Sequence, residues 1–409
     1  MSRPLLPLAL LILTVVSSHA QDLAGLPPEL QEAIERGLKM PAPPPLSAND
    51  PLSIARELSL HITGDEDKAC AMQLRVCQGL VSAGRHDEAA ALAAQISDYR
   101  SALARIHLAR AMLAAGGVRE TAEAPLALAE KQLPETKPWQ QELIRAALHQ
   151  AGLEFGWEPQ RLTAMLEPVR DQEILIGAKV AALAGQARLK GAFDHKAAEE
   201  WLGTLKGPVP VLLDAARELF AVALDCRSKK NAASIKQAEE FTDQALGLLR
   251  RSKVAHIEEL IVAATTLVEA GFEQEAKKLF LLTEGRLGGE TEHTFLLHYK
   301  MTRLWRLRGK QESLRPMLEK SEQQARAQRQ MDRPFALSWI AAAWWQAGDG
   351  LRAERCVVDA GHEAGTNVNP RMRLVGAIDI CLVHAHEKRS LSQPVFEVIQ
   401  NIAQGKQVE

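Results

Sequence analysis

The chain has 409 residues, a formal net charge of −2, 46% hydrophobic residues and 24% charged residues. That length exceeds one small hydrophobic core, so it favours several domains or an elongated repeat array. The near-zero charge, without any block rich in Lys and Arg, argues against a general nucleic-acid or anionic-membrane surface.

The first predicted element is a secretory signal over residues 1–20. Arg3 supplies a positive start, an apolar stretch runs from Leu5 to Val16, and the small residues Ser18 and Ala20 place cleavage before Gln21. We therefore expect an exported bacterial protein, periplasmic or secreted, without a membrane span once the signal is removed. An uncleaved signal that serves as an anchor is the alternative.

Residues 21–50 should form a short helix and a stiff linker. The helix is predicted over 27–38, and five prolines between positions 41 and 51 prevent its continuation. The folded domain is predicted to span 51–409. Asp50 can cap a first helix that begins at Pro51, since proline suits the first helical position.

From there to the end, Ala and Leu dominate, aromatic residues make up only 4% of the chain, and runs of β-branched residues are nearly absent. This composition predicts an all-α fold. One unit recurs within it: a helical run ends on glycine, four residues follow, and a small apolar residue opens the next run. The unit is clearest at Gly84 with Ala89, Gly271 with Ala276, and Gly348 with Ala353; Gly117 with Ala122 and Gly309 with Leu314 keep the spacing.

The chemistry of the unit predicts a helical hairpin. Glycine can adopt the left-handed conformation that ends a helix, and the alanine allows the second helix to approach the first closely. A large apolar residue stands four positions before the glycine in each clear unit, as Leu80, Leu267, Trp305 and Trp344. These offsets place both residue types on the facing sides of the hairpin.

The Gly-x-x-x-x-Ala turn resembles that of the tetratricopeptide-repeat family, whose unit is a pair of antiparallel helices. The resemblance covers roughly residues 66–390 and implies an α–α superhelix, a solenoid of stacked hairpins with about 14 to 17 helices. The later units are 38 and 39 residues apart and so longer than the family's standard, and the proline that usually follows the second helix is missing. Gly156 and Gly191 are expected to be degenerate turns of irregular hairpins.

In that family the first helix of each unit lines a concave face that binds proteins or peptides. Carried over by position, the resemblance implies a partner-binding site that consists of Tyr299, Arg303, Arg306, Phe335 and Trp345. Aromatic residues and arginine are typical of binding hot spots. The alternative is that the aromatic residues pack against neighbouring helices and that the arginines are solvated.

No catalytic motif, cofactor or metal is predicted, because the sequence has neither a phosphate-binding loop nor a nucleophile elbow nor a His-Glu-x-x-His pattern. One group, Cys381, His384 and His386, resembles a metal site in composition. Cys381 and His384 share a helix face, but His386 points away from that face. Two alternatives to a binding scaffold stay open. One is a carbohydrate-active helical toroid that uses His298, Tyr299, Arg303 and Arg306, and the other is a structural spacer.

The five cysteines are too sparse for a disulfide-stabilised scaffold and are expected to be buried and free. Cys356 and Cys381 fall on predicted neighbouring helices, so a disulfide between them is the alternative.

Overall fold

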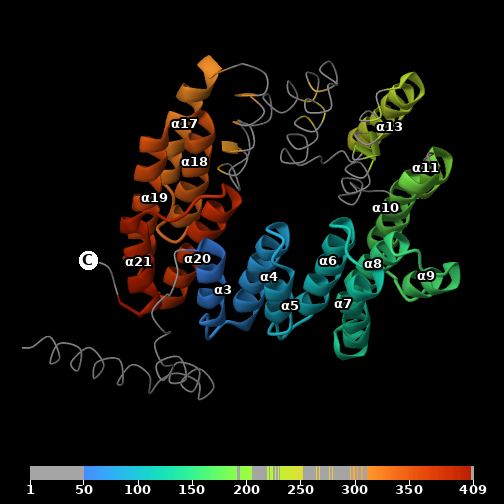
Figure 1. Ribbon diagram of the computed structural model, residues 1–409, viewed down its shortest axis with the longest axis horizontal. Coiled ribbons are helices and arrows are strands. Elements are labelled where there is room, and N and C mark those ends of the chain that lie inside the picture. The colour runs from blue at the N-terminus through green and yellow to red at the C-terminus, as the bar shows by residue number, and fades with distance from the viewer. Residues whose placement is uncertain are drawn as a thin grey trace, which may run out of the picture.

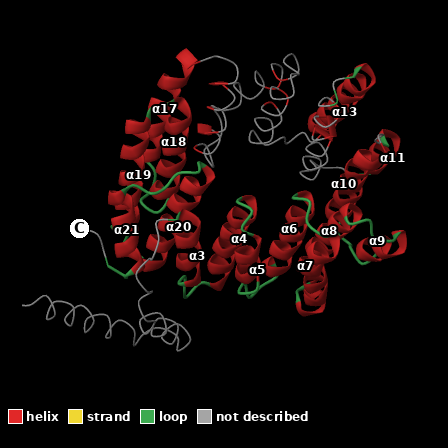
Figure 2. Ribbon diagram, in the orientation of Figure 1, coloured by secondary structure: helices red, strands yellow, loops and turns green. Residues whose placement is uncertain are grey.

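A computed structural model describes residues 50–190, 194–204, 231–251 and 311–406, together with isolated positions between 219 and 306. These residues form fifteen α-helices and one short 3-10 helix, and no strand occurs among them. Figure 2 shows the same all-helical composition. The all-α prediction is confirmed for this part of the chain. The predicted signal, short helix and most of the linker lie outside the described residues.

Helix α3 (Pro51–Leu60) begins where the sequence predicts. The Asp50 carboxylate accepts a hydrogen bond from the backbone N–H of Ser53 at 3.1 Å, and Pro51 occupies the first helical position. Arg85 and Glu88, from the next hairpin, hold this start in place: Arg85 contacts both carboxylates, at 2.5 Å from Asp50 and 2.7 Å from Glu88. The cap is therefore part of the packing between the first helix and its neighbour.

Most of the remaining helices pair as hairpins of consecutive elements that pack against each other. The hairpins are α4 (Glu66–Ser82) with α5 (His86–Ala93), α6 (Arg100–Ala114) with α7 (Arg119–Gln132), α8 (Pro138–Glu154) with α9 (Pro159–Leu166), α10 (Gln172–Lys190) with α11 (His195–Leu202), α18 (Arg333–Ala347) with α19 (Gly350–Gly365), and α20 (Pro370–His386) with α21 (Gln393–Ala403). The 3-10 helix η1 (Leu133–Glu135) follows α7, and α13 (Ala232–Arg251) and α17 (Gln311–Arg326) complete the described helices.

The first helix of one hairpin also packs against the first helix of the next. This holds for α4 with α6, α6 with α8, α8 with α10, and α18 with α20. In Figure 1 these first helices lie on the inner side of a curved row, whereas α5, α7, α9, α19 and α21 lie on its outer side. The inner helices are therefore the ones that can present a common face.

The hairpin turns follow the predicted chemistry at most positions. Gly84, Gly156 and Gly348 have φ of 74°, 61° and 86°, in the left-handed region. The prediction of Gly117 as a turn residue is wrong by one position, because Gly116 has φ of 79°. Gly117 is the next residue, whose N–H returns to the Met112 carbonyl at 3.0 Å, and a Cβ there would stand only 2.8 Å from that same oxygen.

The residues at the predicted offsets form the core between paired helices. Four positions before the turn, Leu80 and Trp344 are at most 1% exposed, and Leu267 and Trp305 are also buried. Five positions after it, Ala89, Ala122, Ala276 and Ala353 are fully buried, as the close approach of the two helices requires. The turns at Gly191, Gly271 and Gly309 lie outside the described residues.

The last hairpins pack against the first helices, a contact that the sequence did not indicate. Helix α20 makes one of the most extensive helix contacts of the described chain with α3 and also touches α4. Figure 1 shows α20 beside α3, so the beginning and the end of the helical region meet. We call this contact the seam.

Polar groups fix the seam in register. The Arg371 guanidinium donates to the carbonyls of Thr63 and Gly64 at 3.1 and 2.9 Å and lies 3.0 Å from the Asp65 carboxylate. Deeper in, Arg75 of α4 lies 2.8 Å from the buried carboxylate of Asp379. Burial raises the pKa of Asp379, and the Arg75 charge opposes that shift.

Candidate partner-binding surface

Four of the five predicted site residues lie in the described chain, Phe335 near the start of α18, Trp345 near its end, and Tyr299 and Arg306 before α17. Tyr299 is buried at 7% exposure, Phe335 and Trp345 of α18 are half-buried, and Arg306 is exposed. Arg303 lies outside the described residues. The predicted residues therefore divide into a buried part around Tyr299 and a more open part around Trp345.

The Tyr299 hydroxyl occupies a polar site between two residues at the end of α20. It donates to Glu387 Oε1 at 2.6 Å and lies 2.9 Å from His386 Nε2. Since the hydroxyl has one proton and gives it to the carboxylate, His386 Nε2 is the donor in the second bond. This arrangement connects Tyr299, which precedes α17 in the chain, with the end of α20.

Aromatic rings surround that hydroxyl. Trp339 lies 5.1 Å from Tyr299, 6.3 Å from Phe335 and 5.7 Å from His386, measured between ring centroids. The indole N–H of Trp339 is buried and has no hydrogen-bond partner. We call Tyr299, Phe335, Trp339, His386 and Glu387 the Tyr299 cluster.

A chain of hydrogen bonds runs from this cluster to the surface. Glu387 Oε2 accepts from Gln346 Nε2 at 2.7 Å, and Gln346 Oε1 accepts from Arg306 Nη1 at 3.1 Å. Both oxygens of Glu387 are therefore engaged by neutral donors. These hydrogen bonds connect Arg306, which precedes α17, with the ends of α18 and α20.

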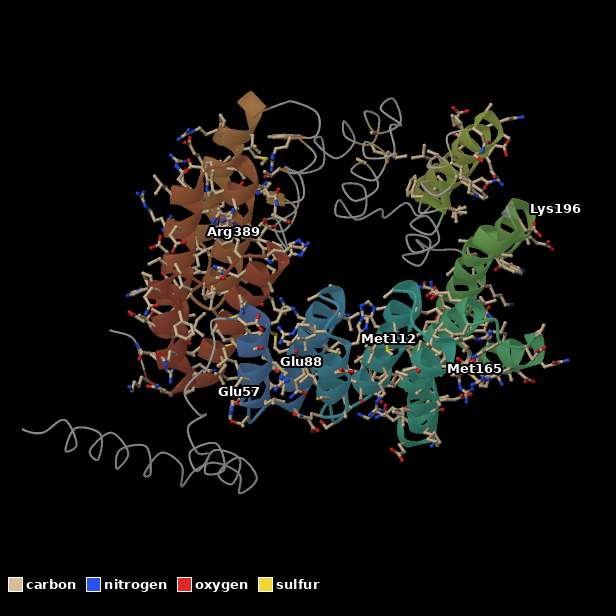
Figure 3. The ribbon with its side chains drawn as sticks, viewed as in Figure 1. Glu57, Glu88, Met112, Met165, Lys196 and Arg389 are labelled. Carbon is tan, nitrogen blue, oxygen red and sulfur yellow. The ribbon has the colours of Figure 1, made fainter. Side chains whose placement is uncertain are left out.

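Trp345 lies next to Gln346 on the surface. The guanidinium of Arg389 stands 4.9 Å from the Trp345 ring centroid, and the His384 ring meets its edge at 5.0 Å. Figure 3 labels Arg389 on the group of helices α17 to α21. We call Arg306, Trp345, Gln346 and Arg389 the Trp345 surface. A pocket of about 230 Å³ adjoins it and is lined by Arg306, Leu314, Arg315, Trp344, Ala347 and Asp349.

The sequence predictions missed Gln346, Glu387, His386 and Arg389. His386, Glu387 and Arg389 were missed because no glycine marks their turn. Lys388 takes the left-handed conformation there, with φ of 54°. Arg389 N–H returns to the His384 carbonyl at 2.8 Å, as the residue after each turn glycine does. Counting back from Lys388 places His386 where α18 carries Gln346, two residues before the turn.

His298 does not join Tyr299. Its Nδ1 lies 2.7 Å from the Ser321 hydroxyl of α17, and burial lowers its pKa to about 4, so the ring is neutral near pH 7. The expectation that a carbohydrate-active toroid would bring His298 and Tyr299 to one site is therefore not met by these side chains.

The metal-like group in α20 is separated in the same manner. His384 is buried and donates from Nδ1 to the Ile380 carbonyl at 2.8 Å, while His386 faces Tyr299. Within the described ranges, no set of three metal-ligating side chains converges. All five cysteines are buried and free, and burial raises the pKa of Cys356 to about 12, so the alternative disulfide with Cys381 is not formed.

A second, larger pocket of about 390 Å³ lies where inner helices α4, α6 and α8 begin. Three of its four carboxylates already have partners: Glu66 accepts from Ser97, and Arg100 pairs with both Asp67 and Asp98. Acidic residues at helix starts are also stabilised by the helix dipole. This pocket is therefore explained by helix capping.

None of the helices in the described residues is both long enough and apolar enough to cross a lipid bilayer. Comparisons of the chain with protein-family models, curated proteins and solved structures find no match.

Proposed function

We propose that this protein is an exported helical-repeat scaffold that binds a protein or peptide partner without chemistry. In this proposal the hairpins form a tetratricopeptide-like solenoid, and the partner docks on the inner face at the C-terminal hairpins. The observation that carries the proposal is the Trp345 surface, where exposed Arg389 stacks on half-buried Trp345 and exposed Arg306 donates to the adjacent Gln346. Aromatic and arginine side chains supply most of the binding energy in protein interfaces.

The Tyr299 cluster supports that surface from below. Its hydrogen bonds hold Gln346 and Glu387 in fixed positions, so less side-chain freedom is lost when a partner binds. Tyr299 itself, being buried, acts in this proposal by positioning its neighbours.

The test is capture of a partner from an envelope extract of the source cells by the full mature chain. Trp345→Ala should abolish capture or weaken it at least tenfold, because it removes the central aromatic contact. Trp139→Ala is the matched control, since Trp139 is exposed at 53% on α8, away from the site. Equal capture by the wild type and by both variants would contradict the proposal.

A carbohydrate-active toroid remains the second candidate, with a different residue set. It is favoured by the Tyr299 hydroxyl, which lies between a carboxylate and an imidazole, as an acid–base group does. The seam also brings the two ends of the helical region together. Release of reducing ends from envelope glycans by the wild type, lost in Tyr299→Phe, would establish this candidate. A structural spacer, the third possibility, would neither capture a partner nor cleave a glycan.

A further inference from the structure

We propose that the Trp345 surface binds an extended acidic segment of a partner polypeptide. The inference rests on the proposed function and specifies the chemistry of the partner. It is carried by two guanidinium groups, those of Arg306 and Arg389, which flank the end of α18.

Neither arginine has a carboxylate partner among the described residues. Arg306 uses one of its five donors on the neutral Gln346 amide, and Arg389 stacks on the Trp345 ring. The nearest carboxylate of the cluster, Glu387, has both oxygens occupied by Tyr299 and Gln346. Both guanidinium groups therefore keep N–H groups that can donate hydrogen bonds to a ligand carboxylate.

Three other arginines near these helices are neutralised. Arg326 lies 2.7 Å from Asp359, Arg333 lies 2.8 Å from Glu363, and Arg352 lies 2.9 Å from Glu319. These pairs belong to α17, α18 and α19 and connect neighbouring helices. The unpaired arginines of the Trp345 surface thus combine positive charge with an aromatic ring at a single place.

The spacing suits an extended chain. Arg306 precedes α17, Trp345 and Gln346 end α18, and Arg389 follows α20. Because Gln346 and Trp345 are adjacent in the chain and each contacts one of the arginines, the two guanidinium groups lie within roughly 20 Å of each other. An extended peptide covers that distance in about five or six residues. Acidic side chains near both ends of such a segment could reach both arginines, with an apolar side chain between them on Trp345.

The experiment measures fluorescence anisotropy of a labelled hexaglutamate peptide titrated with the full mature protein, with labelled hexaglutamine as the neutral probe. Hexaglutamate should bind and hexaglutamine should bind at least tenfold more weakly. The double variant Arg306→Gln with Arg389→Gln should lose at least tenfold in affinity for hexaglutamate. Circular dichroism melting checks that the variant is folded, and single variants replace it if it is not.

Arg355→Gln is the matched control, because Arg355 is an exposed arginine of α19 that also has no carboxylate partner. An equal loss in this control would mean that general positive charge explains binding, and would overturn the inference. So would equal binding of hexaglutamine. Binding of oligogalacturonate without binding of hexaglutamate would assign the surface to an acidic glycan and would also overturn it.

The capture experiment separates failure of this inference from failure of the proposed function. A partner that is retained by the double arginine variant but lost with Trp345→Ala would leave the binding function intact and refute the acidic segment. Loss of capture in both variants, with hexaglutamate competing for the wild type, is the expected result.

Discussion

The hairpins α6–α7 and α18–α19 have the same construction, but the inner helices α8 and α18 differ in the charge near their last residues. Both have a left-handed glycine at the turn, Gly116 and Gly348, and a fully buried alanine in the outer helix, Ala122 and Ala353. Two residues before the glycine that ends each helix, however, α8 carries Glu154 and α18 carries Gln346.

That difference determines whether a neighbouring arginine is neutralised by a carboxylate. Glu154 Oε2 accepts from Arg110 Nε at 2.9 Å and so neutralises an arginine of the preceding inner helix. Gln346 accepts from Arg306 with an uncharged amide. The two regions therefore share their scaffold residues. Their capacity to bind an anion depends on whether the residue that accepts from the arginine is Glu154 or Gln346.

The largest expected effects test the shared scaffold. Gly152 of α8 and Gly376 of α20 both lie where helices approach closely: a Cβ would come within 2.4 Å of the Trp157 ring in one case and 2.9 Å of Ala364 Cβ in the other. Leucine at either position should lower the free energy of unfolding by about 3 kcal/mol or more, because overpacking displaces the backbone. Chemical denaturation measures the loss, and Gly247→Ala, where no atom lies within 4 Å, should stabilise the protein by up to about 1 kcal/mol, because alanine is the better helix former. A small effect at only one site would show that the two regions pack differently.

A second test uses two buried histidines, His149 of α8 and His298, which precedes α17 in the chain. Burial lowers the pKa of His149 and of His298 to about 4, from an unfolded value of 6.5. The unfolded chain therefore binds more protons between those pH values, and stability is lost as the pH falls from about 6.5 to 4. We expect His149→Gln and His298→Gln each to remove on the order of 1–3 kcal/mol of that pH dependence, measured by denaturant unfolding at pH 7 and pH 4.5. If His149→Gln or His298→Gln lost as much stability between pH 7 and pH 4.5 as the wild type does, the assignment of a neutral buried ring would be contradicted.

An exchange of the two acceptors sharpens the comparison directly. Gln346→Glu should neutralise Arg306 and lower the affinity for hexaglutamate by about fivefold to tenfold, since a competing carboxylate is now present. Glu154→Gln should leave that affinity unchanged and cost about 0.5–1 kcal/mol of stability, because the Arg110 pair is partly exposed. Anisotropy titration and denaturation measure the two effects. Unchanged affinity in Gln346→Glu would show that position 346 does not control the charge of the surface.

The smallest expected effect concerns the last turn. Lys388 adopts the left-handed conformation that glycine occupies in the other described hairpin turns. Lys388→Gly should therefore stabilise the protein by about 0.5–1 kcal/mol, measured by thermal or denaturant unfolding. Gly348→Ala should have the opposite sign and a similar size. Destabilisation by Lys388→Gly would mean that the lysine side chain contributes more than the backbone conformation costs.

The sequence was informative where a local pattern has a local cause. A glycine at a helix end and a small residue five positions later follow from backbone and packing geometry, so the turns at Gly84 and Gly348 and the burial of Ala89 and Ala353 could be predicted. Pro51 and Asp50 are predictable for the same reason.

The site was predictable only in part. Tyr299, Arg306, Phe335 and Trp345 follow from the inner-helix offsets, but Tyr299 is buried, and its partners Glu387 and His386 follow a turn that has no glycine to mark it. No pattern in the sequence indicates the seam between α3 and α20. Arg371 and Asp65 are 306 positions apart, and nothing in either local sequence specifies the other.

The seam also has a consequence for synthesis of the chain. Helix α3 is among the first parts of the folded region to be made, yet part of its apolar surface is covered by α20, which is made nearly last. Contacts between residues so distant in sequence form late. Until α20 has been made, the growing chain therefore carries a first helix whose apolar surface this contact does not yet cover, and loss of α20 from the protein would expose that surface of α3 again.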